Sequence, residues 1–284
     1  GHKQPIGPSQ LAAPRRAERS APMCLAALAL AMHPRYALVI AANRDEYPAR
    51  PAASAHWWPQ GFCAGRDERA GGTWFGVTRQ GRYAFVTNVR EPGRNDPAAP
   101  SRGELVPRLL TAPGAIADAC AGVARDGAHY NGFNIVAGEI GRAYHLSNRR
   151  DDVVALRGGV HGIANAALDT PWPKVVRTRE VLAHWCARGD DDLDVLWAAL
   201  ADRTVAADES LPSTGIARER ERLLSAPFIA DPVYGTRSST LLTITHDGEA
   251  RFLERTFGAD GIAGGENQHC FTIARSTSTQ QALG

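Results

Sequence analysis

Short apolar runs separated by polar turns make up much of this chain. Residues 24–31 and 36–42 are two such runs with Pro34 between them, and this pattern predicts a β-hairpin. Residues 73–78 and 83–89 flank the polar turn Arg-Gln-Gly-Arg and predict a second hairpin. Apolar patterning begins with the first of these runs, so we expect a strand to open the folded part of the chain.

The middle and the end of the chain continue this pattern, with helices between the strands. Further strands are expected at 133–137, 142–147, 153–156, 162–166, 239–245, 251–256 and 270–273. Apolar residues at three- and four-residue spacing predict helices over 103–110, 115–125, 174–187 and 193–201. Strand blocks that flank helical blocks without regular βα alternation indicate an α+β fold with antiparallel sheets.

The two ends of the chain lack this patterning. Residues 1–22 carry Pro, Ser and charge without apolar periodicity, and we expect a disordered extension or a propeptide there. Met23 is one of only 2 methionines and is expected to be the translational start. Residues 275–284 form a polar tail, which leaves 23–274 as a single domain.

Composition and charge are those of an ordinary soluble globular chain. Of 284 residues, 44% are hydrophobic and 22% are charged, which excludes a wholly disordered or coiled-coil protein. The 32 basic and 30 acidic residues leave a net charge of only +2, so no nucleic-acid partner is expected. Lys3 and Lys174 are the only lysines. No apolar run approaches the ~18–20 residues of a spanning helix, so no integral membrane association is expected.

Cysteine usage and missing motifs narrow the chemistry further. The 5 cysteines are scattered, odd in number and free of CxxC pairs, which favours a reduced, cytoplasmic protein. The sequence contains no P-loop, dinucleotide-binding, zincin or serine-hydrolase motif. The 9 histidines do not cluster at ligand spacing, so neither a metal nor a cofactor is expected.

Cys24, directly after Met23, is the first candidate for chemistry. Removal of the initiator methionine gives Cys24 a free α-amine with an ordinary pKa of about 7.7–8.0. That amine can accept a proton from the thiol of the same residue, as in an N-terminal nucleophile. The alternative is a cysteine buried at the start of an apolar strand, which is among the commonest fates of this residue.

Four polar residues, Asn-Arg-Asp-Glu, end the apolar run at 36–42. Such a cluster is either a site at a strand end or a solvated turn. In a regular strand Arg44 and Asp45 point to opposite faces. For both side chains to line one pocket, the backbone must bulge or turn there.

Two asparagines and an arginine are further candidates at strand ends. Asn88 lies near the end of 83–89, and Asn165 lies in a run of small apolar residues. A rigidly held carboxamide is a good oxyanion donor, although each asparagine also suits a turn or the end of a ladder. Arg237 precedes a β-branched strand and can stabilise a thiolate or bind a carboxylate, unless it is a surface arginine.

Tryptophans mark the candidate substrate-binding residues. Trp57 and Trp58 fall in a segment, 47–72, that we expect to be a long loop, and loops of that length are often functional. The pair is therefore expected to wall an apolar pocket. Trp74 and Asn134 are further candidates for binding substrate, with a core position as the alternative for Trp74.

Seven motifs in order resemble the NRDE family, whose eukaryotic members are called transport and Golgi organisation proteins. Roles in lipid metabolism, acyl-CoA handling and haem trafficking have been proposed for that family. The resemblance spans 23–273 and rests on Met-Cys at 23–24, Ala-Asn-Arg-Asp-Glu at 42–46, Gly-Gly-Thr-Trp at 71–74, Thr-Asn at 87–88, Arg-Gly-Glu-Leu-Val at 102–106, Tyr-Asn-Gly-Phe-Asn at 130–134 and Thr-Pro-Trp-Pro-Lys at 170–174.

The order of polar residues is also similar to that of the choloylglycine-hydrolase branch of N-terminal nucleophile amidases. This resemblance implies a four-layer αββα fold and cleavage of a non-peptide amide bond. Arg44 and Asp45 depart from it, because that branch spaces its arginine and aspartate three apart. The implied site consists of Cys24 as nucleophile, Arg44 beside its sulfur, Asp45 near the α-amine, Asn88 and Asn165 as the two asparagines, and Arg237 before a late strand.

Two functions follow from the residues and the resemblance together. The first is a cysteine N-terminal nucleophile hydrolase that acts on a small-molecule amide or a thioester, including acyl-CoA or lipid-related substrates. It requires Cys24 to be the first residue of the mature chain. The second is a non-catalytic carrier for haem, acyl-CoA or another amphipathic ligand, and the aromatic segment 47–72 supports it.

Overall fold

The described part of the chain begins and ends in strands of the same sheet. The computed structural model describes residues 23–274. Strand β1 (Met23–Leu30) opens it, and β13 (Ala263–Thr272) is its last element. The predicted extension over 1–22 and the predicted tail over 275–284 lie outside the described residues.

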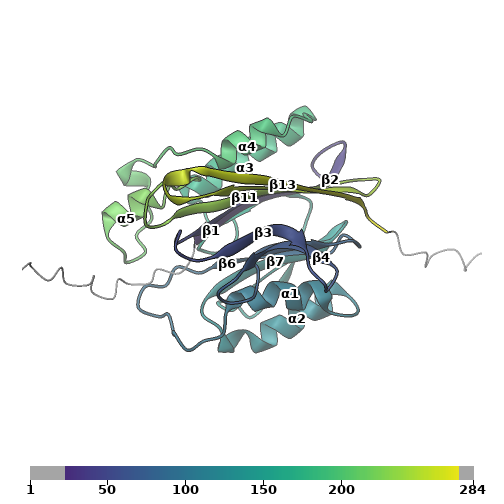
Figure 1. Cartoon of the computed structure of the whole chain (residues 1–284), viewed down its shortest axis with the longest axis horizontal. Helices are drawn as coiled ribbons and strands as arrows, with labels where there is room; N and C mark the ends of the chain where they lie inside the picture. Colours follow the sequence, from purple (N-terminus) through teal and green to yellow (C-terminus); the bar gives the residue numbers. More distant parts are fainter. Residues whose placement is uncertain (1–22, 275–284) are drawn as a thin grey trace, which may run out of the picture.

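Two antiparallel sheets lie face to face, and helices cover the outer face of each (Figure 1). Helices α3 (Pro173–Arg188) and α4 (Asp194–Leu200) cover one sheet, and α1 (Leu105–Thr111) and α2 (Ile116–Asp126) cover the other. The layers therefore follow the order helix, sheet, sheet, helix. This architecture confirms the predicted α+β sandwich of antiparallel sheets.

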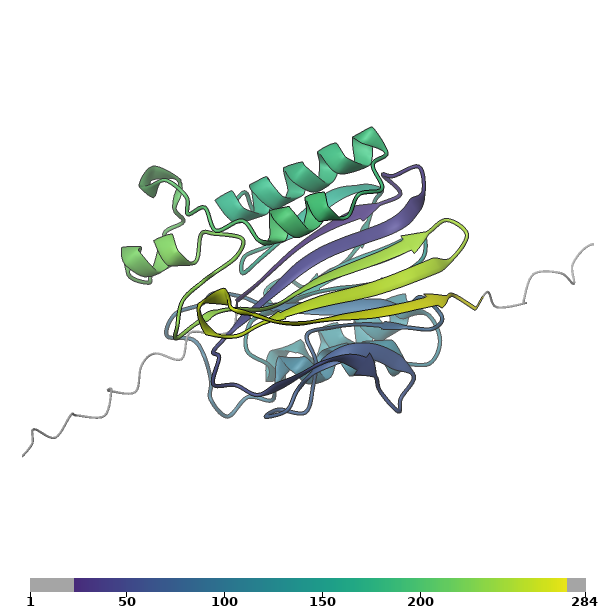
Figure 2. The same cartoon turned by 45° about the horizontal axis from the view of Figure 1, so that its top comes forward.

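The first sheet has six strands in the order β10-β1-β2-β11-β12-β13. β1 and β2 (Tyr36–Glu46) form the predicted hairpin, and β11 (Gly235–Thr245) pairs with the other side of β2. β10 (Gly159–Ile163) lies beside β1, and β12 (Glu249–Phe257) lies between β11 and β13. Figure 2 shows α3 and α4 over the part of this sheet that contains β1 and β2.

The second sheet has seven strands that follow one another in chain order. β5 and β6 form the second predicted hairpin. The simple order agrees with the turn signals between the predicted strands. Its members are β3 (Ala52–Trp57), β4 (Phe62–Asp67), β5 (Phe75–Thr78), β6 (Tyr83–Asn88), β7 (Phe133–Glu139), β8 (Arg142–Ser147) and β9 (Val153–Leu156).

The apolar inner faces of the two sheets form the main core. Leu28, Ile40, Phe75, Phe85 and Phe252 are at most 3% exposed within it. The Phe75 ring is edge-on to Phe85 and Phe252, with centroid distances of 5.7 and 5.2 Å. Burying a side chain of this size contributes about 1.5–3 kcal/mol to stability. This interface therefore holds the two sheets together and fixes the strand ends that carry the site.

Residues 47–72, predicted as a long loop, instead contain β3 and β4, so that prediction is wrong. The two strands are rich in Ala, Ser and Gly, which gives little alternation of apolar and polar residues. A register shift between Ala53 and His56 also interrupts their pairing. Contacts with the rest of the sheet, rather than local periodicity, define this hairpin.

Three other elements differ from the sequence prediction. The strand expected over 162–166 ends at Ile163, so the residues that follow lie beyond the sheet. Helix α5 (Arg218–Leu223) is not predicted by the pattern, because its sequence RERERL contains a single apolar residue. The helix expected over 103–110 begins as a 3₁₀ turn, Arg102–Glu104, before α1.

We expect Gly72→Ala to destabilise the fold by about 1–3 kcal/mol, the usual range for overpacking. A Cβ on Gly72 would lie 2.4 Å from the carbonyl carbon and oxygen of Gly103, and main-chain atoms there cannot move aside. Gly122→Ala in α2 is the matched control, because its Cβ meets nothing closer than 3.7 Å. That change should stabilise by about 0.5–1 kcal/mol. Urea denaturation measures both, and equal effects would contradict the steric argument.

Candidate functional site

Strand ends from both sheets meet at one edge of the sandwich, where β1 begins and β2 ends. Cys24 lies opposite Arg44 in the ladder, and Met23 lies opposite Asp45. Because side chains alternate along a strand, Cys24 and Arg44 share the face toward the second sheet. Asp45 points the other way, toward the start of α3, where it interacts with Lys174. The regular alternation therefore separates the two charged residues of the motif.

A small hollow between the two sheets lies directly in front of Cys24. We call it the Cys24 hollow. The Arg44 guanidinium is 4.2 Å from the centroid of the Trp74 ring in its wall, a cation–π contact. Cys24 is half-buried and faces this hollow rather than packed hydrocarbon alone. The lining includes Cys24, Arg44, Trp74, Phe85, Thr87 and Thr240.

Arg44 belongs to a cluster of two arginines and two carboxylates. Its guanidinium is 3.7 Å from Glu46 and 4.0 Å from Asp67. Arg50 approaches the same two carboxylates at 3.6 and 2.7 Å. The charges balance within the cluster, so Arg44 is fixed beside Cys24 without an uncompensated buried charge.

Asp45 is a fully buried carboxylate with one oxygen unpartnered. Its Oδ1 accepts a hydrogen bond of 2.7 Å from the Thr236 hydroxyl, while Oδ2 has no hydrogen-bond partner. Burial raises the pKa of Asp45 to about 6, and the positive charges of Lys174 and Arg44 limit the rise. The group is therefore ionised at neutral pH and retains one open acceptor site.

The Cys24 thiol is neutral at physiological pH when a residue precedes it in the chain. Burial raises its pKa to about 12, and the negative charge of Asp45 adds to the effect. Arg44 and a hydrogen bond from the Asp45 main-chain amide act in the opposite direction. Since the thiolate is the nucleophilic form of cysteine, any attack by Cys24 needs a base at the moment of reaction.

Two of the predicted asparagines tie the two sheets together at this edge. β10 ends at Ile163, which pairs with Ala26 of β1, and Asn165 follows two residues later in the bend that leaves the sheet. The Asn165 side-chain amide donates a hydrogen bond of 2.8 Å to the main-chain carbonyl of Asn88, and its Oδ1 is buried without a partner. Asn88 itself ends β6 and is 7% exposed.

Asn134, the third asparagine at this edge, is occupied by structural hydrogen bonds. Its side-chain amide donates to the carbonyl of Ala166 at 2.9 Å and to the Thr87 hydroxyl at 3.4 Å. The residue is 1% exposed. Asn134 therefore fixes the segment after β10 against the second sheet, next to Thr87 of the Cys24 hollow.

Arg237 is the extra residue at a bulge in β11, not in β2. The register with β2 shifts between Thr236 and Ser238, on either side of it. Its guanidinium donates to the carbonyls of Tyr47 and Phe257 at 3.1 and 2.9 Å, and to that of Pro48. These bonds hold the chain that leaves β2, and they direct the guanidinium to main-chain oxygens instead of the Cys24 sulfur.

The paired tryptophans lie outside the Cys24 hollow. Trp57 ends β3 and packs at the margin of the main core, with Arg79 3.9 Å above its ring and Phe271 at 5.2 Å. Trp58 points to the helix side of the second sheet, where it packs on Phe62. Only Trp74 among the predicted aromatic residues lines the hollow.

A second cavity lies at the start of α3, between that helix and α5. Its lining includes Lys174, Arg90, Trp172 and Glu221. Arg90 forms an ion pair with Glu221 and lies 4.6 Å from the Trp172 ring centroid. Sequence reasoning did not select these residues, although Lys174 is one of only two lysines and falls in the Thr-Pro-Trp-Pro-Lys motif.

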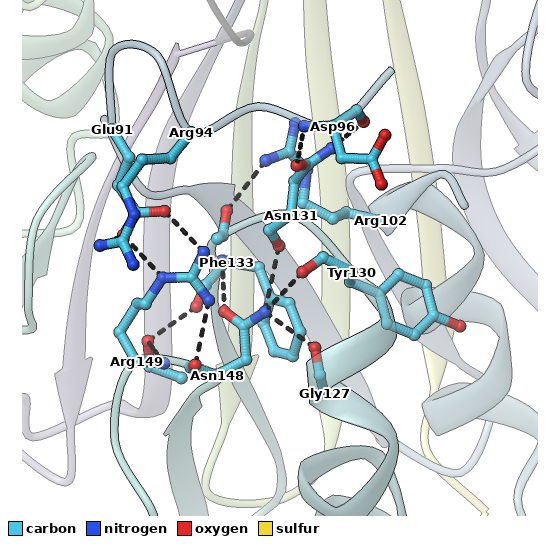
Figure 3. A network of polar contacts seen from close by, with 12 residues as sticks. Glu91, Arg94, Asp96, Arg102, Gly127, Tyr130, Asn131, Phe133, Asn148 and Arg149 are labelled. Carbon is cyan, nitrogen blue, oxygen red and sulfur yellow. Dashed lines mark hydrogen bonds and ion pairs between the residues drawn. The ribbon is translucent and has the colours of Figure 1, made fainter. Parts of the chain in front are cut away.

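A network of polar contacts holds the margin of the site in place (Figure 3). Arg149 donates to both oxygens of Glu91 at 2.6 Å, and Arg102 donates to the carbonyl of Gly132 at 2.9 Å. Burial lowers the pKa of Arg102 to about 10, while the nearby Cys24 raises it. Arg102 is thus a further positive group close to the thiol, and its only sequence signal is the Arg-Gly-Glu motif.

Residues 23–274 contain neither a cluster of metal ligands nor a membrane-spanning helix. No group of three or more His, Cys, Asp or Glu residues in this range is placed to hold a metal ion. No helix within it is long and apolar enough to cross a membrane.

The fold and the site define an αββα sandwich whose first strand carries a cysteine at its second residue, beside an inward arginine and an outward aspartate of the next strand. The chain belongs to the family described as Transport and Golgi organisation 2, whose model matches residues 23–259. This membership confirms the resemblance to the NRDE family.

Proteins named Transport and Golgi organization protein 2, or a homolog of it, are similar to this chain over most of their length. The Bos taurus homolog is 32% identical over 84% of this chain and 93% of its own length. The Homo sapiens homolog is 32% identical over 78% of this chain and 87% of its own length. The Drosophila melanogaster protein is 26% identical over 78% of this chain and 86% of its own length.

In the chain that retains Met23, we expect Cys24 to react with iodoacetamide at pH 8 at least about tenfold more slowly than Cys270. Only the thiolate reacts, and burial raises the pKa of the Cys24 thiol to about 12. Cys270 is exposed on β13 and serves as the reference in the same sample. Peptide mass spectrometry measures both rates, and equal rates would contradict a neutral, half-buried thiol.

Proposed function

We propose that this protein is a cysteine N-terminal nucleophile hydrolase that acts on a non-peptide amide or a thioester. The observation that supports this proposal is the open acceptor of Asp45. Its carboxylate is fully buried, ionised at neutral pH and lies opposite residue 23 in the ladder, with Oδ2 unpartnered. Removal of Met23 exposes the α-amine of Cys24 at this place, and an α-ammonium group is the donor that a buried carboxylate requires.

The α-amine also supplies the base that the neutral thiol needs. Its ordinary pKa of about 7.7–8.0 lets it accept a proton near neutrality. The proton of the Cys24 thiol passes to this amine while Sγ forms a bond to the substrate carbonyl carbon. Arg44, 4.2 Å from the Trp74 ring, lowers the pKa of the thiol and so favours this transfer.

Asn165 is the group best placed to stabilise the oxyanion. It follows β10, the neighbour of β1, by two residues, and its side chain reaches the second sheet at the carbonyl of Asn88. One N–H of its side-chain amide bonds to the Asn88 carbonyl, which fixes the orientation of the amide and leaves the second N–H for the substrate oxygen. Preorganised donors of this kind contribute about 2.7–4 kcal/mol to transition-state stabilisation.

Collapse of the tetrahedral intermediate completes the first half of the reaction. The C–N bond of an amide, or the C–S bond of a thioester, breaks, and the leaving group takes the proton held by the α-ammonium. The acyl group remains as a thioester on Cys24. Water then loses a proton to the α-amine and attacks this thioester, which releases a carboxylic acid and restores the thiol.

The alternative function, a carrier for haem, acyl-CoA or another amphipathic ligand, depended on an aromatic loop that the structure does not contain. The aromatic segment 47–72 instead forms β3 and β4. Trp57 and Trp58 contact the two cores instead of a shared apolar pocket. No specific feature therefore favours this alternative.

For protein made from its own gene, we expect intact mass and N-terminal sequencing to show a chain that begins at Cys24. That protein should hydrolyse members of a panel of N-acyl amides and acyl thioesters, and Cys24→Ala should abolish turnover because the nucleophile is lost. A blocked or extended N-terminus, or full turnover by Cys24→Ala, would refute the mechanism.

Asn165→Ala should lower the rate of hydrolysis by about 10²–10³-fold, the usual effect of losing one oxyanion donor. Asn88→Ala is the matched comparison, because it keeps the main-chain carbonyl that orients Asn165. We expect its effect to be smaller than tenfold. Steady-state kinetics on both variants, with thermal melts as a check of folding, measure the difference. A larger effect at Asn88 would reverse this assignment.

A further inference from the structure

Lys174 is a charged side chain in a position where three effects oppose its charge. It is 1% exposed, and its Nζ has no hydrogen-bond partner. It is the second residue of α3, so its ammonium lies at the positive end of the helix dipole. Arg90 lines the same cavity and adds a further positive charge. Packing alone does not explain a lysine here, because an apolar residue would avoid all three costs.

Asp45 is the group that compensates Lys174. The Lys174 ammonium is the largest influence that lowers the pKa of Asp45, and Asp45 is the largest that raises the pKa of Lys174. Neither Asp45 Oδ2 nor Lys174 Nζ has a hydrogen-bond partner, so the two attract each other without direct contact. Asp45 Oδ2 therefore keeps an open acceptor site.

The other ionisable groups around this pair come from four parts of the chain. Arg44 and Glu46 flank Asp45 on β2, with opposite effects on its pKa. Arg90, which follows β6, lowers the pKa of Lys174. Two further acids raise it, Cys24 on β1 and Glu221 on α5. Val175, next to Lys174, packs on Leu25 of β1, which lies on the same face of the sheet as Asp45.

We propose that Lys174 is a positioning residue that keeps Asp45 ionised at neutral pH, so that Asp45 Oδ2 can receive the α-amine of Cys24. This inference rests on the proposed function for its last step. The absence of a direct hydrogen bond between Lys174 Nζ and Asp45 Oδ2 is part of this arrangement. A direct ion pair would occupy the acceptor, whereas attraction across a gap stabilises the charge and leaves the oxygen open.

The choice of lysine in this arginine-rich chain agrees with this role. Arginine has five donors in a rigid fork and would bind the carboxylate through two hydrogen bonds. The lysine ammonium is a compact charge on a flexible stem, and it ends short of the carboxylate. Burial lowers the pKa of Lys174 to about 8, so it is still charged at pH 7.

The test compares free energies of unfolding of the full chain across pH, for wild type and D45N. The folded pKa of Asp45 is about 6, above its ordinary value of 3.8. The contribution of Asp45 to the free energy of unfolding, measured against D45N, is therefore greatest below pH 3.8. This contribution decreases as the pH rises. The difference should level off near pH 6. With K174M present in both proteins, it should level off about 1–3 pH units higher, because an opposite charge is lost.

Thr178→Val is the matched control on the same helix. Thr178 lies one turn after Lys174, is 2% exposed and has an unpartnered hydroxyl. Its replacement removes a buried polar group without removing a charge, so the levelling pH should stay near that of wild type. K174Q replaces K174M if the methionine variant does not fold. Levelling at the same pH with and without Lys174 would overturn the proposal.

A second measurement separates this inference from the proposed function. In the chain that begins at Cys24, the acid limb of the pH profile of kcat/KM should move up in K174M and stay in place in T178V. An unmoved acid limb overturns the positioning role even if Asp45 titrates as expected. Absence of hydrolysis by wild type overturns the proposed function and the positioning role together, whereas the unfolding data still show whether Lys174 controls Asp45.

Discussion

The pairing of β1 with β2 fixes the position of every charged group around Cys24. It places Arg44 beside the thiol and turns Asp45 to the opposite face of the sheet. A slip of one residue would exchange these two side chains and put a carboxylate beside the sulfur. The register is held by apolar residues such as Leu28 and Ile40, which are both 0% exposed between the sheets. The chemistry of the site therefore depends on the packing of the core.

The strands that carry the site are those that local sequence defines best. Clear apolar runs bounded by turn residues predicted the hairpins β1–β2 and β5–β6, and with them the edge where Cys24 and Arg44 lie. The charge cluster around Arg44 was beyond prediction, because Arg50 and Asp67 come from the segment predicted as a loop. The role of Lys174 also depends on tertiary packing, since α3 must cover the start of β1 before its ammonium meets Asp45.

Unpartnered buried atoms concentrate near this edge of the sandwich. Leaving such a group without a hydrogen bond costs about 1–3 kcal/mol, and a fold selected for stability alone would avoid placing several together. Among the described residues, the atoms at this edge are Asp45 Oδ2, Lys174 Nζ, Arg90 Nε, Asn165 Oδ1 and Ser238 Oγ. Four further such atoms in the described part of the chain lie on Tyr83, His145, Thr178 and Thr243.

The sheet itself divides the site into two faces with different electrostatics. Arg44 lies on the face of the Cys24 side chain. Asp45 and Lys174 lie on the other face, and the backbone of β1 and β2 separates them from the Cys24 sulfur. The nitrogen of Cys24 lies in the plane of the sheet, within reach of both faces. A base at this nitrogen, which the proposed mechanism requires, would have the Cys24 thiol on one face and the Asp45 carboxylate on the other.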